Sequence, residues 1–255
     1  MSTIQARALV LCGEGINCEQ ETAEAFRLAG FKADIRHIRD VIAEEMSLEL
    51  LQSKYHVLVL PGGFSYGDDL SSGKVLALNI KYGLKWDLSK YAERGGLVLG
   101  VCNGFQVLIK LGLFGKDFSI THNESGQFLN TWVKVAPSRS RCVWLKGVGM
   151  MDLPIRHGEG RIVIQSLHKN EALIKAEKQG TLCLKYAEVN PNGSLESLAG
   201  LCDTTGRIFG LMPHPEAFVR WSSHPEWTMQ VSRASAPGQG LAIFENALKE
   251  MKGSV

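Results

Sequence analysis

Hydrophobic residues in the first hundred positions gather in short runs that end at turn-forming residues. Arg7–Cys12 stops before Gly13, Val57–Leu60 stops before Pro61, and Leu97–Val101 runs into Cys102. Short apolar runs of this kind are typical of strands that are buried on both faces of a parallel sheet. A further strand is predicted at Lys32–Ile38.

The segments between these runs have the apolar spacing and end signals of helices. Strands that alternate with helices predict βαβ units and a parallel sheet. Ligands of such sheets bind beyond the carboxyl ends of the strands, which directs attention to residues 13–17, 61–69 and 102–106. Helices are predicted at Cys18–Ala29, which precedes Gly30; at Leu48–Ser53, with Ser47 as its N-cap; and from Asp87 through Arg94.

The second half of the sequence is richer in predicted strands. A turn over residues 203–206 predicts a hairpin. We find no repeat or long linker and predict that residues 1–255 form one domain. Strands are predicted at Phe128–Val135, Val143–Val148, Arg161–Gln165, Leu182–Tyr186, Ser197–Cys202 and Arg207–Met212, and helices at Lys169–Lys178 and Leu241–Lys252.

Composition and charge exclude several classes of protein. Hydrophobic residues make up 45% of the chain, which is too many for a disordered protein. The net charge is only +2, from 28 basic and 26 acidic residues, which argues against a nucleic-acid partner. No apolar run approaches the roughly 18 residues that a membrane-spanning helix needs.

The N-terminal sequence and the cysteines predict a cytoplasmic location. The apolar segment from Ala8 to Cys12 is shorter than the core of a signal peptide, about 7–15 residues. The six cysteines are scattered and form no C-x-x-C pair, so the sequence supports neither a disulfide framework nor a metal site.

One cysteine lies in a sequence that favours chemistry. Cys102 follows a predicted buried strand, precedes an apolar helical segment, and has Gly100 and Gly104 two residues to either side. This is the arrangement of a nucleophile elbow, in which small neighbours permit a sharp strand-to-helix turn. The helix N-terminus there favours the thiolate form. A buried structural cysteine is the alternative reading.

A thiolate that performs acyl transfer needs a base, and His214 is the best candidate. It emerges after the predicted strand Arg207–Met212, and Glu216 is close enough along the chain to orient its imidazole. The same His-Pro-Glu triplet recurs at His224, but that copy follows a loop-like stretch and no predicted strand. We therefore favour His214 as the base.

The reaction also needs donors for an oxyanion, and glycine-rich segments at strand ends can supply them. The backbone N–H groups of Gly63 and Asn103 are the candidates. Two segments that resemble phosphate-binding loops, at residues 13–18 and 67–75, fail their motifs: the first has cysteine for the third glycine, and the second ends in valine. We therefore predict no ATP site and no other cofactor on this chain.

Taken together, these segments resemble class I glutamine amidotransferases, and within them the glutaminases of phosphoribosylformylglycinamidine synthase. The resemblance runs from about residue 8 to residue 250. Its motifs are GVCNGFQ at 100–106, MPHPE at 212–216, PGGFSYGD at 61–68, THNES at 121–125, PIRHGEGR at 154–161 and NPNGS at 190–194.

The resemblance implies an α/β fold: an open, mostly parallel, flavodoxin-like sheet with helices on both faces and an added antiparallel strand segment. It implies a catalytic triad of Cys102, His214 and Glu216 and an oxyanion hole at Gly63 and Asn103. The substrate, L-glutamine, would be bound by residues near these groups, namely Gly62, Phe64, Gln106, His157 and Glu159.

The resemblance also implies partners. Ammonia would pass to a large formylglycinamidine ribonucleotide synthetase subunit that holds ATP and magnesium, and a small accessory subunit could complete the complex. Three alternatives stay open at this point: a glutaminase of another amidotransferase pathway, a cysteine hydrolase of the γ-glutamyl hydrolase or DJ-1-like type, and a non-catalytic scaffold. Gln106 and the triplet from His214 to Glu216 favour the amidotransferase.

Overall fold

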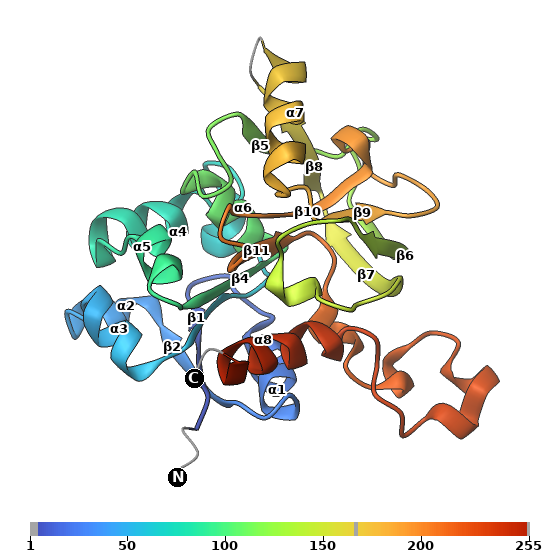
Figure 1. Cartoon of the computed structure of the whole chain (residues 1–255), viewed down its shortest axis with the longest axis horizontal. Helices are drawn as coiled ribbons and strands as arrows, with labels where there is room; N and C mark the ends of the chain where they lie inside the picture. Colours follow the sequence, from blue (N-terminus) through green and yellow to red (C-terminus); the bar gives the residue numbers. More distant parts are fainter. Residues whose placement is uncertain (1–4, 166–167, 254–255) are drawn as a thin grey trace.

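A nine-stranded sheet runs through the structure, a computed structural model that describes residues 5–165 and 168–253 (Figure 1). The strand order is β2-β1-β3-β4-β11-β10-β9-β6-β7. The first five strands in this order pair in parallel, as the hydrophobic runs predict. They are β1 (Arg7–Cys12), β2 (Lys32–His37), β3 (Val57–Leu60), β4 (Leu97–Val101) and β11 (Ile208–Leu211).

Helices cover both faces of the parallel part. Figure 1 shows the contacting pair α1 and α8 on the opposite side of the strands from the contacting pair α4 and α6. The predicted caps form: Ser47 accepts a hydrogen bond from Leu50 N at 3.2 Å, and Asp87 accepts one from Lys90 N at 3.2 Å. The helices are α1 (Glu19–Leu28), α2 (Ile38–Ala43), α3 (Leu48–Lys54), α4 (Lys74–Leu78), α5 (Leu88–Glu93), α6 (Asn103–Lys110), α7 (Lys169–Gln179) and α8 (Leu241–Gly253).

The other part of the sheet is antiparallel and confirms the added antiparallel segment. The hairpin from β10 to β11 turns at residues 203–206, where Asp203 accepts a hydrogen bond from Ile208 N at 3.0 Å. Strands β5 and β8 form a separate two-stranded antiparallel sheet. The antiparallel strands are β10 (Leu198–Cys202), β9 (Leu184–Tyr186), β6 (Leu129–Pro137), β7 (Met151–His157), β5 (Phe118–His122) and β8 (Glu159–Ile164).

One predicted strand is wrong. Within Val143–Val148 the structure has a short 3-10 helix, Val143–Leu145, in which Leu145 N donates to Cys142 O at 3.2 Å. Gly147 follows with a φ of 68°, which a strand cannot accommodate. The run is apolar because its side chains are buried, not because it belongs to the sheet.

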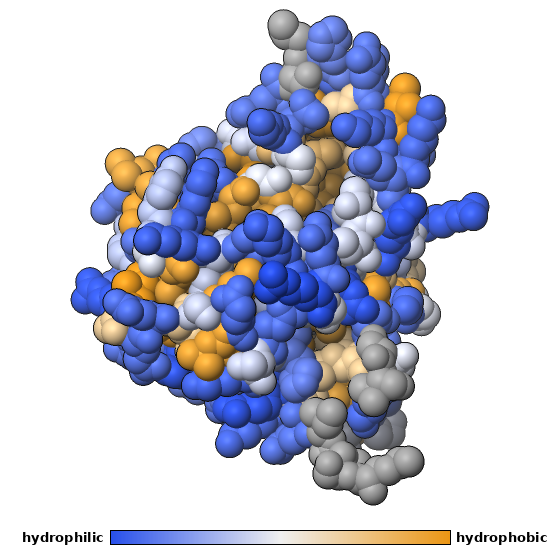
Figure 2. Space-filling view, turned by 60° about the vertical axis from the view of Figure 1, so that its left-hand side comes forward, coloured by the Kyte–Doolittle hydropathy of each residue, from blue (hydrophilic) through white to orange (hydrophobic). Residues whose placement is uncertain are grey.

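The sequence pattern also fails to predict α2, α4, β5 and β7. In β7 the charged residues Asp152 and Arg156 and the imino acid Pro154 obscure the strand pattern. None of the described helices is long and apolar enough to cross a membrane. Figure 2 shows hydrophilic side chains over most of one face, with hydrophobic patches between them.

Candidate active site

Cys102 occupies the sharp turn between β4 and α6. Its backbone has φ 49° and ψ −104°, a strained conformation that non-glycine residues rarely adopt. The turn depends on Gly104, because a Cβ there would lie 1.8 Å from Leu60 O. The residue is only 5% exposed, and its sulfur lies 3.7 Å from Arg156 O in β7. The nucleophile elbow expected from the sequence is therefore present.

His214 and Glu216 form a buried pair directly after β11. His214 Nδ1 lies 2.6 Å from Glu216 Oε1, and both side chains are almost fully buried. His214 N donates to Pro154 O at 2.9 Å, so β7 fixes the backbone that presents the imidazole. Burial opposes the charged form of His214, but the negative charges of Glu216 and of the Cys102 sulfur as thiolate outweigh it and raise its pKa well above 6.5. The imidazole is therefore a proton donor near neutral pH.

Gly62 provides space for this imidazole. A Cβ at Gly62 would lie 2.7 Å from His214 Cε1 and 3.3 Å from Cys18 Sγ. Among the described residues, His214 Nε2 has no hydrogen-bond partner, although the atom is buried. A buried, unsatisfied ring nitrogen near a thiol is free to exchange a proton with a bound substrate.

Gly63, a predicted oxyanion donor, has a backbone N–H that is not used by the segment it faces. It faces Ile16 in an isolated antiparallel bridge, and the hydrogen bonds on either side are made by its neighbours: Phe64 N to Gly15 O at 2.8 Å and Asn17 N to Gly62 O at 3.4 Å. The N–H of Gly63 therefore points away from that segment. Asn103 is the first residue of α6, so its N–H is one of the helix donors that have no partner within the helix.

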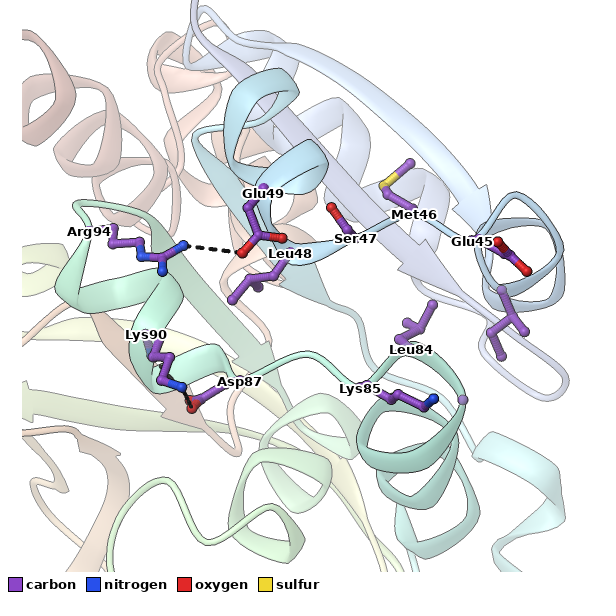
Figure 3. Close-up of a pocket in the computed structure, with 12 residues that line it drawn as sticks. Glu45, Met46, Ser47, Leu48, Glu49, Leu84, Lys85, Asp87, Lys90 and Arg94 are labelled. Atoms are coloured by element: carbon purple, nitrogen blue, oxygen red, sulfur yellow. Dashed lines mark hydrogen bonds and ion pairs between the residues drawn. The ribbon is translucent and has the colours of Figure 1, made fainter.

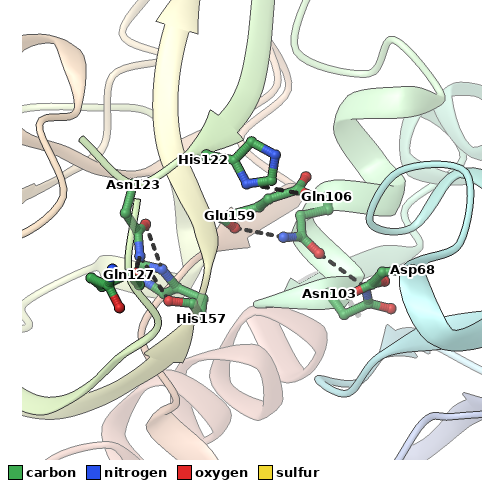
Figure 4. Close-up of polar contacts among 8 residues, drawn as sticks. All are labelled: Asp68, Asn103, Gln106, His122, Asn123, Gln127, His157 and Glu159. Carbon is green, nitrogen blue, oxygen red and sulfur yellow. Dashed lines mark hydrogen bonds and ion pairs between the residues drawn. The ribbon is translucent and has the colours of Figure 1, made fainter. Parts of the chain in front are cut away.

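A chain of amide contacts joins the nucleophile helix to the opposite wall of the site (Figure 4). Asn103 Nδ2 donates to Gln106 Oε1 at 2.9 Å, and Gln106 Nε2 donates to Glu159 O at 2.6 Å. Asn103 Nδ2 also lies 3.2 Å from Asp68 Oδ1, and burial raises the pKa of that carboxyl. Gln106 and Glu159, both predicted substrate contacts, are thus brought together.

His157, another predicted contact, is buried at the end of β7 (Figure 4). Its Nδ1 lies 3.0 Å from Asn123 Oδ1, and its ring fills the space that a Cβ at Gly160 would occupy, 2.2 Å away. Burial, with a smaller contribution from the charge of His214, lowers the pKa of His157 to about 4. His157 is therefore neutral near pH 7, in contrast to His214.

Comparison with known proteins decides the family. Residues 5–249 match the CobB/CobQ-like glutamine amidotransferase domain. The chain belongs to this family. It is a glutamine amidotransferase, and its relatives include phosphoribosylformylglycinamidine synthase subunit PurQ of Dehalococcoides mccartyi, 39% identical over 96% of this chain and 97% of the relative.

Two further relatives agree along nearly the whole length of this amidotransferase. Subunit PurQ of Methanococcus maripaludis is 39% identical over 100% of the chain and 98% of its own length. The solved structure of PurLQS from Thermotoga maritima includes a chain that is 30% identical with a TM-score of 0.75, covering 97% of this chain and 100% of that one. The amidotransferase fold expected from the sequence is confirmed.

Two other residues weighed from the sequence lie outside the buried centre of the amidotransferase site: Phe64, a predicted substrate contact, and His224, the histidine not favoured as the base. Phe64 is 45% exposed, and its ring centroid lies 6.3 Å from that of Phe128. His224, the second His-Pro-Glu histidine, stacks on Trp221 with centroids 5.2 Å apart, and its Nε2 lies 3.5 Å from Asp152. His224 therefore belongs to an aromatic cluster that supports the backbone after Glu216.

Cys18 is the residue near the site that sequence reasoning missed. Its sulfur, a ring nitrogen of His214 and a carboxylate oxygen of Glu216 all lie within 4.8 Å of one another. The available signal was its place at the end of the loop after β1, at the carboxyl edge of the sheet.

A cavity of about 720 Å³ lies elsewhere, between the segment joining α2 to α3 and the α5 region (Figure 3). Its lining carries charges of both signs, including the pair Arg94 and Glu49 at 3.6 Å. It contains none of the residues that form the amidotransferase site, so we do not assign the reaction to it.

Proposed function

We propose that this chain is the glutaminase of a phosphoribosylformylglycinamidine synthase: it hydrolyses L-glutamine and delivers ammonia to a synthetase. The observation that carries the proposal is the placement of Cys102 on a strained turn beside the buried pair of His214 and Glu216. The names of the most similar relatives support this pathway over other amidotransferase pathways.

In the first half-reaction, the Cys102 thiolate attacks the side-chain carboxamide carbon of glutamine. The N–H groups of Gly63 and Asn103 stabilise the oxyanion, and one such donor is typically worth about 3–4 kcal/mol. His214, protonated because the charges of Glu216 and the Cys102 thiolate raise its pKa, gives its proton to the departing ammonia. A glutamyl thioester on Cys102 remains.

In the second half-reaction, His214 is neutral and accepts a proton from water, which attacks the thioester carbon. Glutamate leaves, and the proton on His214 restores the starting state. Glu216, held 2.6 Å from Nδ1, keeps Nε2 as the atom that exchanges protons throughout. The net reaction consumes glutamine and water and yields glutamate and ammonia.

Ammonia is useful only to a second catalytic site. We propose that the partner is a large ATP-dependent synthetase that holds ATP and magnesium, with a small accessory subunit completing the complex, in a cytoplasmic setting. The related structure is of PurLQS, an assembly named for three components, which supports such a partnership. The exposed rings of Phe64 and Phe128 offer the synthetase an apolar contact beside the site.

The test combines this chain with the synthetase, ATP and formylglycinamide ribonucleotide. Cys102→Ala should lower the rate of glutamine-dependent product formation by about four orders of magnitude or more. The rate of product formation with added ammonia should be unchanged. Cys12→Ala, which changes a half-buried cysteine outside the site, is the matched control. We expect the isolated chain to hydrolyse glutamine slowly until it docks.

Two results would contradict the proposal. Full glutamine-dependent turnover by Cys102→Ala would remove the thioester mechanism. Rapid hydrolysis of γ-glutamyl peptides, with no stimulation of the synthetase, would favour a γ-glutamyl hydrolase-like enzyme instead. Full-speed glutamine hydrolysis by the isolated chain would contradict the coupling alone.

A further inference from the structure

Three cysteines that are far apart in the sequence converge in the antiparallel part of the fold. The sulfurs of Cys142, Cys183 and Cys202 all lie within 4.8 Å of one another, and all three residues are buried. No histidine or carboxylate of residues 5–165 and 168–253 belongs to this group. From this cluster we infer a metal site that holds one divalent ion of the kind that prefers sulfur ligands, such as Zn²⁺.

The separations suit a metal ion. Zinc binds thiolate sulfur at about 2.3 Å, so sulfurs sharing one ion lie roughly 4 Å apart, within the range found here. Cys202 Sγ lies 3.5 Å from Gly180 O. That separation is close to the roughly 3.6 Å expected between a sulfur and an oxygen ligand on one tetrahedral zinc, which makes the Gly180 carbonyl the candidate fourth ligand.

The backbone around the cluster holds the three cysteines in place. Ser138 N donates to Cys183 O at 2.9 Å, and Cys202 N donates to Thr181 O at 2.9 Å. Next to Cys142, Val143 N donates to Gly206 O at 3.0 Å. These bonds tie together three segments of the chain, so the donors are arranged before an ion binds and little ordering entropy opposes binding.

Donor chemistry and charge select the ion. Sulfur ligands favour zinc and copper(I) over magnesium and calcium. Three thiolates with a divalent ion leave a net charge of −1, whereas a monovalent ion leaves −2, and burial penalises the larger charge. Any of the three side chains that starts as a thiol releases its proton to solvent when it binds.

The cluster is separate from the glutaminase site. In the β10–β11 register Cys202 pairs with Phe209, near the start of β11, whereas Leu211 pairs with Val101 next to Cys102. The thiol cluster therefore lies toward the opposite end of β11 from the nucleophile, and the inference does not depend on the proposed reaction.

The experiment titrates metal-stripped, reduced full-length chain with Zn²⁺ against a chromophoric chelator, and with Cd²⁺ as a spectroscopic probe. We expect one equivalent to bind, a thiolate-to-cadmium ultraviolet band with the intensity of three sulfurs, and a metal-dependent rise in Tm. Replacing Cys183 or Cys202 with Ser should weaken zinc binding by about 100-fold or more. Loss of a residue that only hydrogen-bonds to a metal ligand typically weakens binding by roughly 10- to 100-fold, so the larger loss identifies a direct ligand. Cys12→Ser is the matched control and should bind as the unmodified chain does.

Three results would overturn the inference. The first is a cadmium spectrum of the unmodified chain without the three-sulfur band, a measurement that does not depend on how the variants fold. The second is binding that survives Cys202→Ser but is lost in Cys18→Ser, which would place the ion beside His214 and Glu216. The third is the loss of two titratable thiols without metal, restored by reductant, which would identify a disulfide.

Discussion

The parallel and antiparallel parts of the sheet contribute different kinds of groups to the glutaminase site. The parallel part presents reactive side chains at strand ends: Cys102 after β4 and His214 after β11. The antiparallel part presents mainly backbone, with Pro154 O holding His214 N and Arg156 O beside the Cys102 sulfur. The antiparallel part also contributes His157, which is buried and neutral near pH 7.

This difference indicates that the side chains that react with substrate and the backbone groups that hold them in position come from separate parts of the sheet. Changes in the parallel part should lower kcat, because they remove groups that exchange protons or bonds with substrate. Changes in the antiparallel part should alter the stability of the protein or the KM for glutamine, because its groups form the walls of the substrate pocket. The predictions below test this division, beginning with the largest expected effect.

Glu216→Gln should reduce kcat by about 10²–10⁴-fold with little change in KM. The amide removes the negative charge that raises the pKa of His214 and no longer fixes its tautomer. Steady-state kinetics with glutamine and the synthetase would measure this, and circular dichroism would verify folding. A rise in KM with normal kcat would contradict the assignment of Glu216 to the chemical machinery.

His157→Gln should make the protein less sensitive to acid. The pKa of this buried histidine is about 4, below the ordinary 6.5, so the unfolded chain binds a proton that the folded chain refuses. His157 therefore reduces stability as the pH falls from 6.5 toward 4, by up to about 3 kcal/mol. The glutamine amide of the variant cannot titrate but can still donate a hydrogen bond to Asn123 Oδ1.

Urea unfolding at pH 7.5 and pH 4.5 measures this effect. The variant should lose less stability between the two values than the unmodified chain does. His122→Gln is the matched control, because the side chain of His122 is 77% exposed. An equal pH dependence in the His157 variant and the unmodified chain would show that the pocket does not exclude the charged imidazole.

The sequence predicts the parallel part well for a physical reason. Strands buried on both faces must be apolar throughout, so β1, β3 and β4 begin and end where the hydrophobic runs do. The turn at Cys102 can also be predicted from the sequence, because its glycines are required by close contacts such as that of Gly104 with Leu60. The nucleophile of the candidate triad, Cys102, therefore follows from a local pattern.

The antiparallel part is harder to predict from the sequence, because its residues are chosen by contacts with segments that are distant along the chain. In β7, Arg156 is tolerated because its side chain is exposed, and Pro154 because β7 is an edge strand, where no ladder hydrogen bond needs the missing N–H. Pro154 O accepts from His214 N, a residue distant in sequence. The same holds for Cys18, whose role depends on the packing of the first loop against His214. Spacing along the chain carries no signal for such contacts.

Gln106→Leu tests the connection between the two parts. Gln106 joins Asn103 on α6 to Glu159 O on β8, so the apolar side chain leaves both groups without this partner. We expect kcat/KM for glutamine to fall by about 10- to 100-fold, mainly through KM. Lys110→Ala, at the other end of α6, is the matched control. A loss confined to kcat would instead place Gln106 with the reactive groups.

Cys18→Ala should have the smallest effect and refine the description of the parallel part. Its thiol lies beside His214 and helps to raise the pKa of that imidazole, so its loss should move the alkaline limb of the kcat profile to lower pH. A thiol is a weak hydrogen-bonding group, so kcat at the optimum should change by no more than about threefold. Cys12→Ala serves as the control, and an unshifted limb would show that Cys18 only fills space. A loss as large as that of Glu216→Gln would make Cys18 a member of the chemical machinery, and the triad would then need a fourth residue.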